Sequence, residues 1–400
     1  MPTCTEKIFA RGCGKETVVP GEIVDVAIDR AMIHDNNAGL VMKNFTAITN
    51  PRVWAPERVA FVIDHHSPST TVKAVKHHSA MRAFAKEHGI PHFFDCGSGI
   101  SHIVMLEAGL AGPGEIIVGT DSHTTGEGAL GAFATGIGAT EMAAALVTGR
   151  IWFQVPHTVK VVLNGEKPAF LDARDIMNEV LHRFGPDGAN YMAVEFHGPA
   201  AQKMSTEERT MCCVLAMEMG AKNAMFPDSE DEDAAYERVE LFDVAAMQPN
   251  IAVPNLPTNA KPLAEIAAKK IPVNQAFIGA CTGGLLRDLE TAARVLAGRT
   301  VAPGVRLLVI PASRRIYNQA LEKGYIKTLH DAGAIIGSPA CGGCGGHDAG
   351  ILAEGEVCIA NSPRNMDGRM GGGGIVYLAS AATVAESAAQ GCIAASGKDA

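Results

Sequence analysis

Three absences narrow the class of protein that this sequence encodes. No apolar run approaches the roughly 20 residues of a membrane span, and the N-terminal stretch lacks the continuous apolar core of a signal peptide. There is no basic surplus, since the net charge of −9 argues against broad binding to nucleic acid or anionic membranes. Ten cysteines in 400 residues are too few for a disulfide scaffold, so most should be reduced and buried. We therefore expect a cytoplasmic protein with no membrane or nucleic-acid partner.

The residues that are present predict an α/β fold. Hydrophobic residues make up 47% of the chain and charged residues 19%, which suits two or three buried cores in a chain of this length. Short apolar runs predict strands at 59–63, 115–119, 276–280, 306–311, 334–337 and 356–360. Helical stretches such as 139–151 and 286–298 lie between them. This alternation indicates mainly parallel sheets covered on both faces.

Two segments suggest domain boundaries. The stretch TVKVVLNGEKPAFLD predicts a hairpin whose turn is Asn164-Gly165, and it marks the first domain edge. The polar, proline-bearing stretch at 254–262 is a candidate linker. We therefore expect α/β domains at 1–160, 161–272 and 273–400.

Polar side chains gather where the predicted strands end. The segments that follow strands are Asp64-His65-His66, Asp121-Ser122-His123, Cys281, the pair Cys341 and Cys344, and NSPRNMDGR at 361–369. Open α/β sheets place their ligand sites at the carboxyl ends of parallel strands. The sequence therefore predicts one site built from several distant segments.

The cysteines in these segments form a set of one plus two. Three thiolates can hold an iron–sulfur cluster and leave one iron without a protein ligand, which makes that iron a Lewis acid. A structural zinc half-site or buried, unliganded thiols are equally compatible with Cys341 and Cys344 alone. In the zinc case the protein is a non-catalytic binding module, and His347 is the candidate fourth ligand. A dinucleotide site is disfavoured because TGIGATE lacks the strand context and acidic partner of a GxGxxG loop.

Seven motifs in order resemble the aconitase superfamily, and in particular the large subunit of two-subunit isopropylmalate dehydratases and homoaconitases. They are DHHSP (64–68), GSGISH (97–102), GTDSHTTGEGALG (119–131), VEFHGP (194–199), IGACTGG (278–284), GSPACGGC (337–344) and NSPRNMDGRMG (361–371). The resemblance implies three α/β/α domains around a central cleft. It also implies one [4Fe-4S] cluster on Cys281, Cys341 and Cys344, with one iron not ligated by protein, and reversible removal of water from a hydroxylated di- or tricarboxylate.

The same resemblance implies roles for residues that bind the substrate. Arg364 and Arg369 match a carboxylate clamp, and a planar guanidinium can hold a carboxylate by two parallel hydrogen bonds. Ser122 is expected to contact substrate or cluster sulfur. His34 and Asp35 match a segment that lines the cleft, although a turn or capping role is an alternative for them.

The resemblance also implies the groups that transfer protons. Asp64 with His65, and Asp121 with His123, resemble pairs in which a carboxylate orients an imidazole. We expect His65 to donate the proton to the departing hydroxyl, with His102 and His123 as alternatives.

Three further expectations concern residues outside these pairs. Glu195 in VEFHGP matches a glutamate near the hydroxyl site, where burial would raise its pKa. His77, His78 and His88 lie in a charged helical stretch and are expected to be solvated. Cys212-Cys213 lie in an apolar helix-like run and are expected to be core.

Two positions depart from the family pattern. Gly283 and Pro363 stand where related sequences commonly carry asparagine, so two side-chain amides near the cluster are missing. We expect these changes to retune the cluster or to indicate a substrate other than ordinary isopropylmalate.

The resemblance also implies a partner. We expect this chain to lack the family's swivelling fourth domain, and a separate small subunit to supply that domain with a serine base for the carbon-bound proton. Because relatives choose substrate largely through that subunit, isopropylmalate, methylmalate-type, homocitrate-type and dimethylmalate-type acids all remain candidates.

Overall fold

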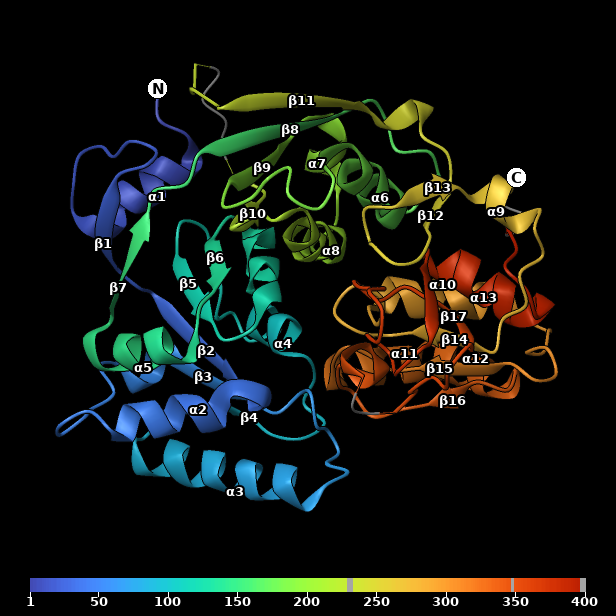
Figure 1. The fold of residues 1–400 in the computed structure, drawn as a ribbon, viewed down its shortest axis with the longest axis horizontal. Coiled ribbons are helices and arrows are strands. Elements are labelled where there is room, and N and C mark those ends of the chain that lie inside the picture. The colour runs from blue at the N-terminus through green and yellow to red at the C-terminus, as the bar shows by residue number, and fades with distance from the viewer. Residues whose placement is uncertain (229–232, 347–348, 396–400) are drawn as a thin grey trace.

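The computed structural model describes residues 1–228, 233–346 and 349–395. In this part of the chain there are three larger sheets, each packed against helices, and a small two-stranded sheet that lies beside the first of them (Figure 1). No helix among the described residues combines the length and the apolar character that crossing a membrane requires.

The first domain is a five-stranded parallel sheet with strand order β4-β3-β2-β5-β6. The elements are α1 (Cys4–Cys13), β1 (Ile23–Ala27), β2 (Arg30–His34), α2 (Asp35–Thr46), η1 (Pro56–Arg58), β3 (Val59–Val62), α3 (Val72–Glu87), β4 (His92–Phe94), α4 (Ser101–Glu107), β5 (Ile116–Gly119), η2 (Ser122–Leu130), β6 (Phe133–Gly136), α5 (Ala139–Thr148) and β7 (Arg150–Gln154). The strands predicted at 59–63 and 115–119 are confirmed as β3 and β5. The antiparallel pair β1-β7 was not predicted.

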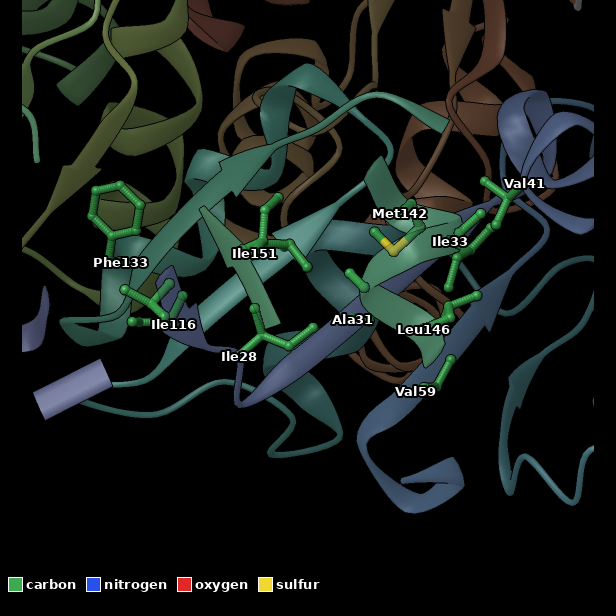
Figure 2. Close-up of a cluster of buried hydrophobic side chains, with 14 of the residues drawn as sticks. Ile28, Ala31, Ile33, Val41, Val59, Ile116, Phe133, Met142, Leu146 and Ile151 are labelled. Carbon is green, nitrogen blue, oxygen red and sulfur yellow. The ribbon is translucent and has the colours of Figure 1, made fainter. Parts of the chain in front are cut away.

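Alternating side chains of this sheet pack into two separate cores. Ala31 and Ile33 of β2 lie in a cluster with residues of α2, α3 and α5, part of which Figure 2 shows. Met32, between them, packs on the opposite face with Val104 and Met105 of α4. Because successive strand residues point to opposite faces, burial on both sides requires a continuous apolar run. The three-layer arrangement predicted from such runs is confirmed here.

The second domain is a four-stranded parallel sheet with strand order β10-β9-β8-β11. The elements are β8 (Thr158–Asn164), α6 (Ala173–Phe184), β9 (Ala193–His197), α7 (Pro199–Lys203), α8 (Thr206–Ala216), η3 (Met217–Met219), β10 (Asn223–Met225), β11 (Arg238–Asp243) and η4 (Val244–Ala246). Cys212 and Cys213 of α8 are fully buried in its core, as predicted.

The hairpin predicted at Asn164-Gly165 is wrong. Gly165 does turn the chain, with a φ of +79°, but the partners of β8 among the described residues, β9 and β11, are both parallel to it. The chain after the turn leads into α6, which Asp172 caps. The local turn signal was correct, whereas the pairing was decided by strands far along the chain.

The third domain is a seven-stranded sheet with strand order β13-β12-β18-β17-β14-β15-β16. The elements are β12 (Asn250–Ala252), β13 (Ala260–Pro262), α9 (Leu263–Ala267), β14 (Gln275–Ile278), α10 (Leu286–Leu296), β15 (Arg306–Val309), α11 (Arg314–Glu322), α12 (Tyr325–Asp331), β16 (Ile335–Ile336), η5 (Gly342–Gly345), β17 (Val357–Ala360), β18 (Ile375–Leu378) and α13 (Ala381–Gln390). All four strands predicted in this part of the chain are confirmed.

Two features of this sheet differ from expectation. The segment predicted as a linker at 254–262 contains β13, and β12 pairs antiparallel with both β13 and β18, so strands assigned to the second domain join the third sheet. One face of the sheet packs on α10–α13. On the other face, Phe277 and Leu308 pack with Cys344, Leu352 and Met370 of the loops around the predicted cluster site.

Candidate active site

Neighbouring strands of the first sheet bring the predicted histidines and aspartates together. β3, β2 and β5 are adjacent and parallel, so they end at the same edge. Asp64-His65 follows β3, His34 ends β2 and Asp35 comes next, and Asp121-Ser122 follows β5. The convergence predicted from strand ends is therefore present in the structure.

His65 is held by two carboxylates. Its Nδ1 lies 2.8 Å from Asp64 Oδ1, and its Nε2 lies 3.8 Å from Asp121 Oδ2. Burial opposes protonation of the ring, but these negative charges outweigh it and raise the pKa of His65 to about 9. The other oxygen of Asp64 accepts a hydrogen bond of 2.8 Å from Ser101 N. His65 is therefore cationic near neutral pH and fixed at Nδ1.

Asp121 is the centre of the histidine network. It accepts from His123 N at 2.7 Å, and its carboxylate lies 3.2 Å from His102 Nε2 and 3.8 Å from His34 Nε2. Although burial opposes ionisation, the hydrogen bond from His102 and the nearby imidazoles hold the pKa of Asp121 well below its usual range. Asp121 is thus a fixed negative charge.

His102 lies between Asp121 and Glu127, a carboxyl that the sequence analysis did not single out. His102 Nδ1 is 3.4 Å from Glu127 Oε1. Burial opposes its protonation, but the two carboxylates raise the pKa of His102 to about 10. Both side chains are enclosed, with exposed fractions of 2% for His102 and 0% for Glu127. His102 is therefore better placed to orient Asp121 than to meet a substrate.

His123 pairs with a different carboxylate from the one expected. Its Nε2 lies 3.0 Å from Glu218 Oε1, whereas its Nδ1 is 3.6 Å from Asp121. Glu218 also accepts a 2.6 Å hydrogen bond from Arg364 Nε, and Arg364 Nη2 donates to Ser122 Oγ at 3.1 Å. Glu218 is thus a second-domain residue that orients both an imidazole of the first domain and an arginine of the third.

Glu218, and not Glu195, is the glutamate of the second domain that reaches this network. Glu195 lies inside β9, where its Oε1 accepts from Thr5 N and Oγ1 and its Oε2 accepts from Tyr236. Its carboxylate holds the start of α1, because a position within a buried strand faces packing elements rather than the strand end. A carboxylate in the apolar run TMCCVLAMEMG was the only sequence signal for Glu218.

Asp35 fixes the backbone that follows β3. Its two oxygens accept from His65 N at 3.1 Å and from His66 N at 2.9 Å. His78 Nε2 also lies 3.2 Å from Asp35, and the His78 side chain is 3% exposed, so the prediction that His78 is solvated is wrong. Burial opposes ionisation of Asp35, but the hydrogen bond from His78 and the neighbouring donors lower its pKa.

His34 lies against His65, with 4.6 Å between ring centroids, and its Nε2 is 3.1 Å from Thr120 O. Burial lowers the pKa of His34. His34 therefore contributes a neutral ring to the wall beside His65.

The three predicted ligand cysteines gather beside this network. Burial raises the pKa of Cys281 and Cys341, and each of these two thiols also feels the charge of Cys344 and of Asp121. Cys341 N donates to Asp64 O at 3.0 Å, which ties the cysteine loop to the His65 turn. Burial raises the pKa of the Cys344 thiol, and the positive charges of Arg369 and Arg364 partly offset that rise.

The donor set fits a three-ligand cluster. Cys281 and Cys344 are 4% and 5% exposed, and the charges that reach them come from Asp121, Arg364 and Arg369. Three thiols, two of them buried and that of Cys341 half-buried, can hold a cluster and leave one iron without a protein ligand. His347, the candidate fourth ligand of a zinc site, lies outside the described residues.

Asp121 and Ser122 also line a cavity of about 530 Å³ that extends to Trp152, Tyr191 and Lys222. Trp152 is 62% exposed, so this side of the network lies close to the protein surface.

Comparisons with known proteins agree with the motif order. The Aconitase family (aconitate hydratase) matches residues 6–231 and 228–391. The chain is 44% identical to the 3-isopropylmalate dehydratase large subunit 1 of Methanopyrus kandleri, over 97% of each chain. It is 42% identical to the probable methanogen homoaconitase large subunit of Methanothermobacter thermautotrophicus, over 98% of this chain and 96% of that one.

A solved structure shows the same fold. The holo-form of aconitase X from Thermococcus kodakaraensis superposes with a TM-score of 0.54 at 13% identity, covering 99% of this chain and 94% of that one. The resemblance drawn from the motifs is confirmed, and a [4Fe-4S] cluster is typical of the family. The chain belongs to the aconitase family and is a hydro-lyase.

Proposed function

We propose that this chain is the large, cluster-bearing subunit of a two-subunit hydro-lyase that reversibly dehydrates a hydroxylated di- or tricarboxylate. The observation that carries the proposal is that the buried Cys281 and Cys344 and the half-buried Cys341 lie within range of one another's charge, close to Asp121 and to Arg364. Relatives named as large subunits, over nearly their whole length, support the two-subunit arrangement.

The cysteines would hold the cofactor. Cys281, Cys341 and Cys344 would bind a [4Fe-4S] cluster, which when bound supplies a Lewis-acidic iron without a protein ligand. The thiols must lose their protons to bind, and burial in the cofactor-free chain opposes that loss.

The arginines bind and orient the substrate. Arg364 is held by Glu218 through Nε, which fixes the plane of its guanidinium, and Ser122 Oγ accepts from its Nη2. A guanidinium fixed in this way can grip a carboxylate in a set direction. Arg369 supplies a second positive charge, which acts on Cys344.

His65 carries the proton that leaves with the hydroxyl. Asp64 holds the imidazolium at Nδ1, and we assign the transferred proton to Nε2, which lies 3.8 Å from Asp121. The hydroxyl and this proton then depart as water. The carbon-bound proton goes to a base, for which we propose the serine of a small subunit that carries the swivelling domain.

The same assignment limits the substrate to a class of hydroxylated carboxylic acids. Isopropylmalate or a methylmalate-like acid is the first candidate, and the homoaconitase relative supports a tricarboxylate as the alternative. Dimethylmalate-type acids belong to the same chemical class. Co-purification with the small subunit and assay of a panel of 2-hydroxy acids will decide among them.

Cysteine replacement tests the cluster assignment. After reconstitution without oxygen, Cys281→Ser, Cys341→Ser or Cys344→Ser should each abolish the brown chromophore. Cys358→Ser is the matched control, since Cys358 is fully buried in β17 of the same sheet and should keep the chromophore. A wild-type chain that stays colourless, or one that binds zinc instead, contradicts the proposal.

A further inference from the structure

The side chain of Asn361 occupies the space that a side chain at position 283 would need. A Cβ atom built on Gly283 would lie 1.9 Å from Asn361 Oδ1 and 2.1 Å from Asn361 Cγ. Gly283 is not among the glycines with a left-handed backbone, so its conformation does not demand glycine. Gly283 is required because the Asn361 amide fills its place.

That amide bridges the two sides of the Cys281 loop. Asn361 Oδ1 accepts from Gly279 N at 3.1 Å, and Asn361 Nδ2 donates to Gly283 O at 2.9 Å. Thr282 Oγ1 donates to the main-chain oxygen of Asn361 at 2.8 Å. The Asn361 side chain therefore holds main-chain groups two residues before and two residues after Cys281, and the Thr282 side chain is bonded to the same residue.

The loop needs such support because its backbone is strained. Ala280, directly before Cys281, has a φ of +64°, in the left-handed region that disfavours residues with a Cβ. Strained conformations persist only when surrounding contacts over-determine them. Asn361 is 2% exposed, so water does not replace its hydrogen bonds.

Arg174 of the second domain holds Asn361 from behind. It is 1% exposed, and it donates from Nη1 to Asn361 O at 3.2 Å and from Nη2 to Ser362 O at 3.0 Å. Its Nε donates to Asn178 Oδ1 at 3.1 Å. The planar guanidinium thus fixes two successive carbonyls at the start of the loop that carries Arg364.

We propose that Asn361, held by Arg174, is a positioning residue for Cys281. From its place directly after β17, its amide performs the task of a side-chain amide at position 283. The proposal rests on the proposed function, because it treats Cys281 as a cluster ligand. It also accounts for one departure of the sequence from its family: the amide missing at position 283 is supplied by Asn361, the residue directly after β17.

An exchange of the two residues tests the proposal. Gly283→Asn alone should clash with Asn361, and Asn361→Gly alone should leave Gly279 N and Gly283 O without partners. Each single variant should lose its visible absorbance in air about 10-fold faster than the wild type, because supporting hydrogen bonds of metal ligands are typically worth that much or more. The double variant Gly283→Asn with Asn361→Gly should recover iron and sulfide content to within about twofold of the wild type.

A second readout does not need the cofactor. In the cofactor-free chain, hydrogen–deuterium exchange of the peptide covering 279–283 should be faster in Asn361→Gly than in the wild type. Asn365→Gly is the matched control, because Asn365 is also 2% exposed in the same loop but donates to Val253 O and Val376 O. That control should leave exchange at 279–283 unchanged.

The outcomes separate this proposal from the proposed function. Unchanged exchange at 279–283 and unchanged air stability in Asn361→Gly overturn the positioning role. A folded double variant that performs no better than the single variants also overturns it. If the double variant does not fold, Asn361→Asp replaces it: this isostere keeps the acceptor, loses the donor to Gly283 O, and must shorten the air lifetime of the absorbance. A wild type that assembles no cluster contradicts the function, whereas the exchange measurement still decides the positioning role.

Discussion

At the scale of single residues, the site depends on carboxylates that set the charge of histidines. The Asp64 and Asp121 charges raise the pKa of His65 from 6.5 to about 9, despite burial. A raised pKa in the folded state means that protonated His65 contributes stability below its unfolded pKa of about 6.5. That contribution is lost as pH rises through about 9. The positive charge of His65, its contribution to stability and its ability to donate a proton are therefore all lost as pH rises through about 9.

The first prediction concerns the pH dependence of dehydration. In the assembled enzyme, kcat for dehydration should fall as pH rises above about 9, because His65 then lacks its proton. Asp64→Asn should move this alkaline limb to lower pH by about 1–2 units, since it removes a neighbouring charge that favours the imidazolium. pH–rate profiles of both proteins measure the shift. An alkaline limb that stays in place in Asp64→Asn would show that another group donates the proton.

The second prediction concerns Arg364. Lysine cannot donate to Glu218, Ser122 and a carboxylate with one planar fork, so Arg364→Lys should raise KM about 10- to 100-fold. Steady-state kinetics of the assembled enzyme give this value. Arg58→Lys, on the exposed surface of the first domain, is the control and should leave KM unchanged. Equal KM values for Arg364→Lys and wild type would remove Arg364 from the substrate site.

At the scale of elements, turns after strands are fixed by carboxylates from neighbouring elements. Asp35, the first residue of α2, accepts from two main-chain amides of the turn after β3. The hydrogen bond from His78, in the middle of α3, orients the same carboxylate. Two helices and one turn are therefore joined at a single side chain.

The third prediction follows from that junction. Asp35→Asn should lower the free energy of unfolding of the first domain by about 2 kcal/mol at neutral pH. Asparagine has only one side-chain oxygen, so it cannot replace both carboxylate oxygens that accept from His65 N and His66 N. The pKa of Asp35 is lowered in the folded state, so its contribution is present above the usual value of 3.8 and is lost as pH falls through the folded-state value. Urea unfolding at neutral pH and in acid should therefore show a difference that narrows toward low pH. A constant difference would contradict the ionised role of Asp35.

Elements were also the level at which sequence prediction worked best. Buried parallel strands are continuous apolar runs, so β3, β5, β14 and β17 were visible, and the residues after them could be placed at one edge. Contacts between segments far apart in the chain could not be predicted from the sequence. Glu218 meets Arg364 across 146 residues, and Asn361 fills the space beside Gly283 across 78 residues. No local pattern encodes such pairs, and the same limit explains the error at Asn164-Gly165.

At the scale of the whole molecule, each domain supplies a different part of the site. The first domain contains His65 and its carboxylates, and the third contains the predicted cysteines and arginines. The second domain supplies Glu218 and Arg174, which orient residues of the other two rather than meet a substrate. Hydrogen bonds within the site therefore also join the three domains to one another.

The fourth prediction is that this chain binds substrate without converting it. The groups proposed to bind a hydroxy acid lie on this chain, whereas the base for the carbon-bound proton is assigned to the small subunit. The cluster-loaded chain should therefore bind a 2-hydroxy diacid in calorimetric titration, and Arg364→Lys should weaken that binding about 10-fold or more. Turnover should be negligible until the small subunit is added, and it should then rise in proportion to the complex formed. Turnover by the isolated chain at a rate near that of the complex would place the base among its own residues and refute the division of labour.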